Sequence, residues 1–227
     1  MFEVMVAIIA IIGTIVSYLI GRLIYQRFYT PLLLPISVAT VIIIVVLLLG
    51  NISYDTYMIG GKWIHTFLGP AVVALAYPLY QHRDLLRQLA FPILLGNLVG
   101  VLVGIFSGYW LAKLVNIEGE LLYSLIPKSV TTPVAMEISE SIGGIGSLAA
   151  VLVIFAGLTG VFFGPLMFRI FKIRSEIGRG TGMGAASHAI GTAAAFENGM
   201  LEGSISTISM IISAVFASIL APLIIFL

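Results

Sequence analysis

Residues 126–144 carry the side chains best suited to chemistry, although this segment lies between two long apolar runs. It combines a lysine, two glutamates, two prolines and several hydroxyls. Pro127 and Pro133 lack a backbone N–H, and each biases the preceding residue away from helical geometry. The sequence therefore predicts that a helix begins here, with Thr132 as its cap and Pro133 in its first turn.

The start of this helix predicts an anion-binding site. The first N–H groups of a helix have no partner within it, and together with the helix dipole they attract negative charge. Lys128 could contact the same anion, or it could extend to the membrane surface as lysines near span ends do. The residues expected to bind substrate in this segment are Lys128, Ser129, Thr131, Thr132 and Pro133.

Glu137 and Glu140 are three residues apart, so a helix that begins at Pro133 places both on one face. A carboxylate held in apolar surroundings favours its neutral form, which suits a proton carrier. The alternative is that this arm emerges at the outer surface and leaves both carboxylates hydrated. We expect proton coupling at Glu137, whereas the two interpretations are equally balanced for Glu140.

A second polar segment, residues 180–197, is rich in glycine and alanine and contains His188. A lone histidine is more often a packing residue than a ligand, and no cysteine or second histidine lies at metal-ligand spacing. An imidazole inside a membrane segment is costly unless it is paired, which favours a role in handling a proton or an anion. The expected site residues here are Ser187, His188, Gly191 and Thr192.

Asn97 is a polar residue within the apolar run 89–114. Gly96, Gly100 and Gly104 lie around it at a spacing of four, which lets another helix approach closely. The first expectation for Asn97 is a hydrogen bond between helices, and the second is a contact with substrate.

The composition indicates that the solvent of these segments is lipid. The 227 residues are 60% hydrophobic and only 9% charged, whereas a soluble domain has about 25% charged residues. Each segment in lipid must satisfy its own backbone, so such continuous apolar runs predict an all-α polytopic membrane protein. The expected spans are residues 4–20, 31–49, 63–80, 89–114, 145–168 and 204–227.

Basic residues between the runs predict the orientation of the chain. They cluster at residues 22–27, 83–87 and 169–179, and such clusters are retained on the cytoplasmic side. Lys113 and Ile145 then lie on the same outer side, so the segment between them is expected to enter and return as a re-entrant hairpin or two half-helices. Two alternatives remain for the 180–197 segment, which either returns or crosses fully, and the side of the C-terminus depends on this.

We expect a single integral membrane domain over residues 1–227. Its N-terminal spans lie in residues 1–114, and its C-terminal half, residues 115–227, contains two re-entrant segments, 127–141 and 180–197. These broken helices are expected to meet near the bilayer midplane.

Gly69 and Pro70 predict a further helix break. The sequence Gly69-Pro70-Ala71 resembles Thr132-Pro133-Val134, which indicates an internal repeat. Segments interrupted by glycine and proline in both halves of a transporter point to its binding site.

The sequence also excludes several kinds of protein. A net charge of +1, with short basic clusters only, is unsuited to nucleic acid. Without cysteine there is no thiolate nucleophile or disulfide framework. The sequence has no HExxH, Walker or catalytic-triad pattern, so we expect neither an enzyme nor a cofactor or metal. Glu3 and the lack of an early basic region favour a retained first span over a cleaved signal.

Residues 127–140 and 186–192, together with residues 67–76, resemble the LrgB/CidB family of bacterial membrane proteins. The resemblance extends over nearly the whole chain and implies the bacterial cytoplasmic membrane. It also implies two functions. One is holin- or antiholin-like control of murein hydrolase export and autolysis with a small LrgA/CidA-type membrane partner. The other is transport of small monocarboxylates such as pyruvate, or of glycolate and glycerate by the similar plastid protein.

The residue chemistry favours transport. A holin needs little beyond apolar helices that oligomerise, whereas this chain places proline, lysine, glutamate, histidine and hydroxyls within expected hydrocarbon. We predict alternating access around a midplane site formed by residues 127–141 and 180–197, with Glu137 or His188 carrying a coupled proton. Close glycine-lined helix faces further predict a homodimer.

Overall fold

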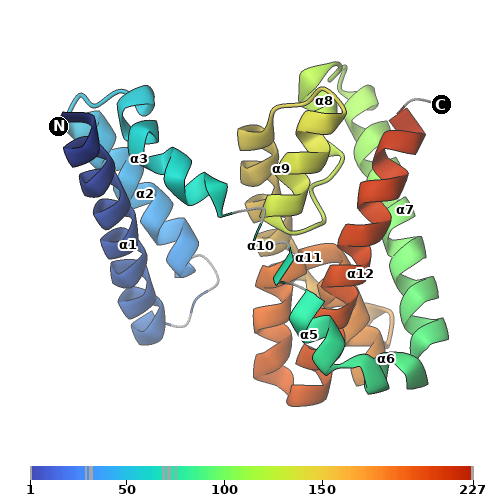
Figure 1. Ribbon diagram of the computed structural model, residues 1–227. Coiled ribbons are helices and arrows are strands. Elements are labelled where there is room, and N and C mark those ends of the chain that lie inside the picture. Colours follow the sequence, from blue (N-terminus) through green and yellow to red (C-terminus); the bar gives the residue numbers. More distant parts are fainter. Residues whose placement is uncertain are drawn as a thin grey trace. The chain divides into compact units, whose positions relative to one another are not determined.

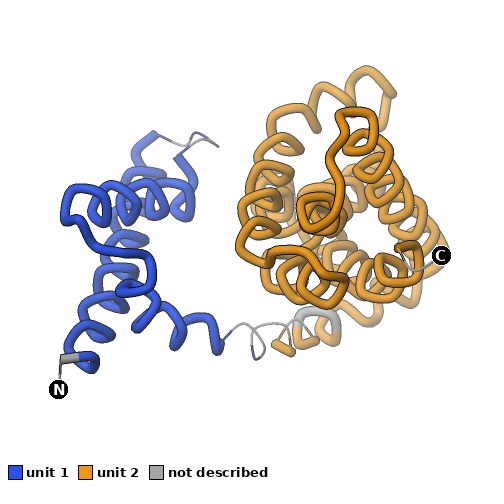
Figure 2. The backbone as a smooth tube through the Cα atoms, turned by 90° about the horizontal axis from the view of Figure 1, so that it is seen from above, with its two compact units in different colours: residues 1–71 blue, residues 72–227 orange. Residues whose placement is uncertain are grey.

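The computed structural model describes residues 2–28, 30, 33–67, 70, 73, 74 and 76–225 (Figure 1). The described part of the chain is helical and contains no strand, so the predicted all-α class is confirmed. The chain forms two compact units, residues 1–71 and 72–227 (Figure 2). A single membrane domain over the whole chain stays a prediction.

The first unit consists of α1 (Phe2–Phe28), α2 (Pro35–Leu49) and α3 (Tyr54–Thr66). α1 is long and apolar enough to cross a membrane, whereas α2 has only 15 residues. α3 packs closely on α1 at Gly60, where a Cβ would lie 2.5 Å from the Ala7 carbonyl oxygen. The Tyr57 and Thr14 hydroxyls are hydrogen-bonded at 2.9 Å and hold the same pair of helices together.

The span expected over residues 63–80, with its break at Gly69 and Pro70, contains parts of two described helices. α3 begins before it, because the Ser53 hydroxyl accepts a hydrogen bond from the Thr56 N–H and caps the helix. α3 then ends at Thr66, and a separate helix, α5 (Ala76–Gln81), begins ten residues later. Of the predicted helix break, Gly69 lies outside the described residues, and Pro70 is exposed with helical geometry.

Three long helices form the frame of the second unit: α7 (Ala90–Leu114), α10 (Gly146–Ile170) and α12 (Met200–Ile225). With α1 they are the four helices of the described chain that are long and apolar enough to cross a membrane. Their boundaries agree with the runs predicted from residue 89 onward. α12 begins four residues earlier than expected, and the short α6 (Arg83–Gln88) precedes α7.

The outward faces of these helices are apolar. On α7, Phe91, Val103 and Trp110 are 76%, 61% and 64% exposed. The buried residues recur at spacings of three and four on the opposite face, at Ile93, Asn97, Val101, Ile105, Gly108 and Ala112. A protein in water rarely exposes apolar surface so continuously, so these faces fit a lipid environment. The inward faces carry the polar residues considered below.

The first of two hairpins lies between α7 and α10 and consists of α8 (Glu120–Leu125) and α9 (Thr132–Ser141). Helices of 6 and 10 residues are about 9 and 15 Å long, too short to cross a bilayer core of about 30 Å. The Ser124 hydroxyl accepts a hydrogen bond from the Ile145 N–H at 2.8 Å, so the chain returns to the level at which it left. The turn at residues 126–131 forms the tip of this first hairpin.

The second hairpin is α11 (Glu176–Asn198), which is broken at His188. Its two ends meet the same residue, because Arg179 forms an ion pair with Glu202 and Asn198 donates a hydrogen bond to it. In a straight helix Arg179 and Asn198 would lie about 28 Å apart. The two ends of α11 therefore lie close together, and α12 runs on to the opposite end of the unit. Whether the segment 180–197 re-enters or crosses the bilayer stays a prediction.

The two hairpins start from opposite ends of the second unit (Figure 1). Ile93 of α7, Ile177 of α11 and Ile205 of α12 cluster at one end, near the arginines and lysine of residues 169–179, which we call the basic end. Ala112 of α7, Leu122 of α8 and Ala221 of α12 cluster at the opposite end. The positive-inside rule predicts that the basic end faces the cytoplasm, and this orientation stays a prediction. Entry of both hairpins into the bilayer stays a prediction.

Candidate functional site

A row of glycines on α7 connects the two hairpin tips. A Cβ on Gly100 would lie 3.4 Å from the Ala185 Cβ of α11, and one on Gly104 would lie 3.3 Å from the Ser129 Oγ of the first tip. Gly104 is about 15 Å from the Leu114 end of α7 and about 21 Å from its other end. The first tip, and the arm of α11 that leads to the break at Ser187 and His188, which we call the second tip, therefore contact the middle of α7 one helical turn apart.

α10 receives the second tip at a similar depth. A Cβ on Gly157 would lie 2.8 Å from the His188 Cε1, and one on Gly160 would overlap the Ser187 Oγ. Gly157 lies about 17 Å from the start of α10, again near the middle of the helix. Glycine at these two positions is what allows Ser187 and His188 to fit between the helices.

The N-terminus of α9 lies at the first tip. Thr131 is the cap residue, with an extended backbone (φ −63°, ψ 145°), and α9 begins at Thr132 with Pro133 in its first turn. The predicted helix start is confirmed, but the cap is Thr131 and not Thr132, because Thr132 already has helical geometry. The Thr131 hydroxyl does not close the helix end, and its Oγ1 is buried with no hydrogen-bond partner among the described residues.

Lys128 points into the second unit. Its Nζ donates a hydrogen bond to the Gly104 carbonyl oxygen at 2.9 Å, and a Cβ on Gly108 would lie 2.7 Å from the same nitrogen. The side chain is half-buried. Lys128 therefore points inward and not to the membrane surface, and its contact with an anion stays a prediction.

His188 has a backbone conformation (φ 43°, ψ −130°) that residues other than glycine rarely adopt. Such a conformation costs about 1–3 kcal/mol and persists where the surroundings impose it. The buried imidazole donates from Nε2 to the Val153 carbonyl oxygen at 3.0 Å, so in the neutral ring Nδ1 is the acceptor. Ser187 beside it is 1% exposed, and its Oγ has no partner among the described residues.

The remaining predicted residues of this region hold helices together. The Asn97 Oδ1 accepts from the Ser213 hydroxyl at 2.7 Å, and its Nδ2 donates to the Ile93 carbonyl at 2.6 Å. The first expectation for Asn97, a hydrogen bond between helices, is therefore confirmed. The Thr192 and Ser206 hydroxyls are hydrogen-bonded at 2.8 Å and join α11 to α12.

Gly191 has a packing role, because a Cβ there would lie 2.6 Å from the Met183 carbonyl oxygen. Glu137 and Glu140 do not join the tips. Both are exposed on the outer face of α9, whereas Val134 and Ile138 face the core. Their proton-carrying role stays a prediction.

The sequence analysis missed the hydroxyls of α12. Ser206, Ser209 and Ser213 are fully buried, and the Ser209 Oγ has no partner among the described residues. Their spacing of three and four residues puts them on one helix face. That spacing is visible in the sequence and could have identified the polar face of an otherwise apolar helix.

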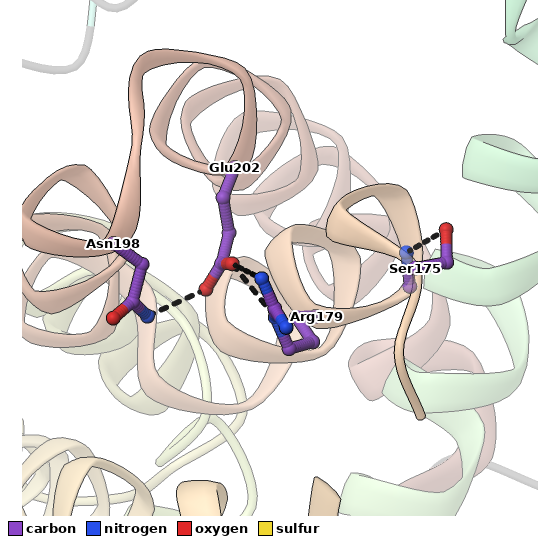
Figure 3. A network of polar contacts seen from close by, with 5 residues as sticks. Ser175, Arg179, Asn198 and Glu202 are labelled. Atoms are coloured by element: carbon purple, nitrogen blue, oxygen red, sulfur yellow. Dashed lines mark hydrogen bonds and ion pairs between the residues drawn. The ribbon is translucent and has the colours of Figure 1, made fainter. Parts of the chain in front are cut away.

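The sequence analysis also missed a buried ionic network (Figure 3). Arg179 donates from Nε and Nη2 to the Glu202 Oε2 at 2.8 and 2.7 Å, and the Asn198 Nδ2 donates to Oε1 at 2.8 Å. Glu202 is 1% exposed, and the Arg179 side chain is 30% exposed. An acidic residue just before an apolar run was the available signal.

A cavity of about 680 Å³ opens at the basic end of the second unit. The C-terminal half of α10, the loop after it and both arms of α11 form its walls. The lining residues are Val161, Pro165, Phe168, Arg169, Lys172, Ile173, Arg174, Arg179, Met183, Ala194, Glu197 and Asn198.

Comparison with known proteins identifies relatives over the full length. The chain matches the model of the LrgB-like family over residues 14–227. It is 46% identical to "Uncharacterized protein YxaC" of Bacillus subtilis over 222 residues, 98% of this chain and 96% of that protein. It is 37% identical to "Holin-like protein CidB" of Staphylococcus epidermidis over 227 residues, 100% of this chain and 99% of that protein. No solved structure matches the chain significantly.

The chain therefore belongs to the LrgB-like family. With its long apolar helices, it is a multi-pass protein of the bacterial cytoplasmic membrane. The name of the staphylococcal relative agrees with the holin-like alternative, and none of these names gives a substrate.

Proposed function

We propose that this LrgB-like protein carries small organic anions of the pyruvate or glycolate class across the membrane, through a site between the two hairpin tips. The observation that carries the proposal is a pair of buried hydroxyls, Thr131 Oγ1 and Ser187 Oγ, that lack partners among the described residues. Nearly all buried polar groups in proteins are hydrogen-bonded. Five buried hydroxyls of the described residues are exceptions, and of these Thr131 and Ser187 lie at the chain breaks of the two tips, where a ligand can complete their hydrogen bonds.

The charge of the ligand follows from the donors near the first tip. The first turn of α9 offers free N–H groups, Thr131 offers a hydroxyl, and Lys128 contributes an ammonium group close by. Pro133 removes one N–H but leaves the others of the first turn. Such a set of donors complements a carboxylate, which accepts several hydrogen bonds and carries one negative charge.

His188 is the preferred proton carrier in this proposal. Its Nε2 is engaged by the Val153 carbonyl, which leaves Nδ1 as an acceptor for a proton. Its strained backbone supports a functional role, since such conformations gather at binding sites and switches. Glu137 is the second candidate, because its exposed position gives it no described link to the tips.

The two hairpins start from opposite ends of the second unit, and this arrangement suits alternating access. Each hairpin is attached at one end of the unit and reaches the middle, so a movement of either tip opens the site toward one side only. Broken helices that meet near the midplane are a common basis of such transport.

A holin-like function is the second candidate, and the name of the staphylococcal relatives, holin-like protein CidB, supports it more directly than it supports transport. A holin-like chain would form large lesions by oligomerising, either alone or with a small LrgA/CidA-type partner. A homodimer is compatible with both functions. The two functions differ in the size of what passes and in the need for polar tips.

Uptake by proteoliposomes tests the proposal. Purified protein is expected to accumulate labelled pyruvate when a pH gradient is imposed, while a large entrapped dye is retained. Thr131→Val, which keeps the shape of the side chain but removes its hydroxyl, should lower uptake about tenfold or more, the effect of losing a hydrogen bond to a charged group. Ser37→Ala is the matched control, because the Ser37 Oγ is another buried hydroxyl without a described partner, in the first unit.

Further variants separate the roles within the proposal. His188→Ala should abolish uptake driven by the pH gradient, and Glu137→Gln should reduce it only if this carboxylate carries the proton. Dye leakage from liposomes that hold the unmodified protein, with no saturable uptake, would favour the holin-like function instead. Uptake that requires an added LrgA/CidA-type protein would make this chain one subunit of the carrier.

A further inference from the structure

We infer that the cavity at the basic end is a second anion site, which collects the small carboxylate before it reaches the hairpin tips, and that Arg179 exchanges Glu202 for this carboxylate. The inference rests on the proposed function and extends it to a named entry site. It gives a role to the buried ionic network, which the tips do not use.

The walls of the cavity have an excess of positive charge, even with Arg179 paired to Glu202. Arg169, Lys172, Arg174 and Arg179 line it, against the single carboxylate of Glu197. Arg169, Lys172 and Arg174 form no ion pair with another described residue. A concave surface with one sign of charge concentrates ions of the opposite sign. Its volume of about 680 Å³ is within the range of small-molecule sites.

Arg179 can bind a second carboxylate. A guanidinium has five N–H donors, and the hydrogen bonds to Glu202 use those at Nε and Nη2 (Figure 3). Arg179 also lines the cavity and is partly exposed, so its remaining donors are accessible from there. Glu202 keeps only its hydrogen bond from Asn198 when Arg179 turns to a ligand, so the new ion pair between Arg179 and the ligand must offset most of the stabilisation that Glu202 loses.

The cavity leads toward the second tip. Met183 forms part of its lining, and a Cβ on Gly164 would lie 3.0 Å from the Met183 sulfur. One turn deeper along the same two helices, the Ser187 Oγ lies against Gly160. Met183 and Ser187 are one helical turn apart, about 6 Å along the axis, so the flexible thioether side chain of Met183 lies between the cavity and Ser187.

Arg179, Glu202 and Asn198 connect anion binding in the cavity to the second hairpin, α11. Glu202 holds both arms of α11 to the start of α12, one arm through Arg179 and the other through Asn198. A carboxylate that takes Arg179 away from Glu202 removes the ionic contact of the first arm and leaves its close packing on α12 at Gly180 and Gly184. Binding at the entry site therefore loosens the element that carries Ser187 and His188.

Equilibrium binding in nanodiscs of pure phosphatidylcholine tests the inference. Labelled pyruvate is the probe, and uncharged pyruvamide is the control ligand. We expect Lys172→Gln/Arg174→Gln to weaken pyruvate binding about tenfold and higher ionic strength to weaken it as well. Lys62→Gln, which removes one exposed charge from α3 of the first unit, should leave the affinity unchanged.

Two variants of the network give opposite results that a folding defect would not produce. Glu202→Gln frees the Arg179 guanidinium and should tighten pyruvate binding severalfold, whereas Arg179→Lys keeps the charge, loses the planar fork and should weaken binding. Unchanged affinity in both variants would overturn the exchange at Arg179. Equal binding of pyruvamide would overturn the anion site itself.

Three further outcomes separate this inference from other accounts. Loss of pyruvate binding when 30% phosphatidylglycerol is added would assign the basic residues to lipid headgroups and overturn the inference. Normal uptake by all the cavity variants would also overturn it while leaving the proposed transport intact. Cavity binding by a protein that takes up no pyruvate would support the entry site and refute the proposed function.

Discussion

The two partners of the buried ion pair should contribute unequally to stability. Glu202 is 1% exposed, whereas the Arg179 side chain is 30% exposed and faces a cavity that is open to water. Replacing Arg179 with Gln leaves a buried carboxylate with one remaining described partner, Asn198. Replacing Glu202 with Gln leaves a guanidinium that water can reach.

The different exposure of Arg179 and Glu202 determines how much stability each substitution should cost. Arg179→Gln should lower the free energy of unfolding by about 3–5 kcal/mol, the usual cost of leaving a charge buried and unpaired. Glu202→Gln should cost only about 1–2 kcal/mol, because the amide still accepts a hydrogen bond and the guanidinium becomes hydrated. Arg179→Met/Glu202→Met should recover most of the loss, because it leaves no unpaired charge behind.

Reversible unfolding in mixed detergent micelles, followed by far-UV circular dichroism, measures these differences. Arg87→Gln is the control, because its ion pair with Asp84 is 3.8 Å long with both side chains at least 70% exposed, so its loss should cost at most about 1 kcal/mol. Equal losses for Arg179→Gln and Glu202→Gln, or a larger loss for Glu202→Gln, would refute the argument from burial.

Two more predictions concern helix contacts and use the same unfolding assay. Asn97→Leu should lower the free energy of unfolding by about 1–3 kcal/mol, because it leaves the Ser213 hydroxyl unpaired. Adding Ser213→Ala should recover part of that loss, and no recovery would contradict the hydrogen bond between the two residues. Gly184→Val should prevent α11 from packing against the Ser206 carbonyl and abolish uptake. Gly13→Val should be tolerated, because no atom lies near the new Cβ. Equal behaviour of the two variants would contradict the close packing of Gly184 on α12.

The parts of the fold that were predictable depend on local chemistry. The length of the apolar runs identified α7, α10 and α12, and the loss of backbone donors at Pro127 and Pro133 identified the break before α9. Both signals act within a few residues and need no partner elsewhere in the chain.

The break at His188 could not be located in this way. The surrounding residues include no proline, and the 176–198 segment forms regular helix on both sides. The chain reverses there because Glu202 holds both ends of α11 and because Gly157 and Gly160 make room for the turn. These contacts join residues far apart in sequence, so the pattern alone left both alternatives open.

Burial of single polar residues was equally hard to predict. In the sequence, Glu202 has the pattern of a hydrated carboxylate in the first turn of a helix at the membrane surface. Its burial follows from the ion pair with Arg179, which is distant in sequence. Glu137, in contrast, belongs to the most polar segment of the chain, yet α9 directs it outward. Residue type indicated which side chains could do chemistry, but the packing of α9 and α11 decided which of them face the tips.

A reversible cross-link at the first tip tests most directly whether the hairpin tips form the path of the substrate. The chain contains no cysteine, and a Cβ on Gly104 would lie 3.8 Å from the Ser129 Cβ, a distance that suits a disulfide. Gly104→Cys/Ser129→Cys should cross-link on oxidation in proteoliposomes, lose pyruvate uptake and regain it on reduction. A complete cross-link with uptake unchanged would contradict the proposal that substrate passes between the tips.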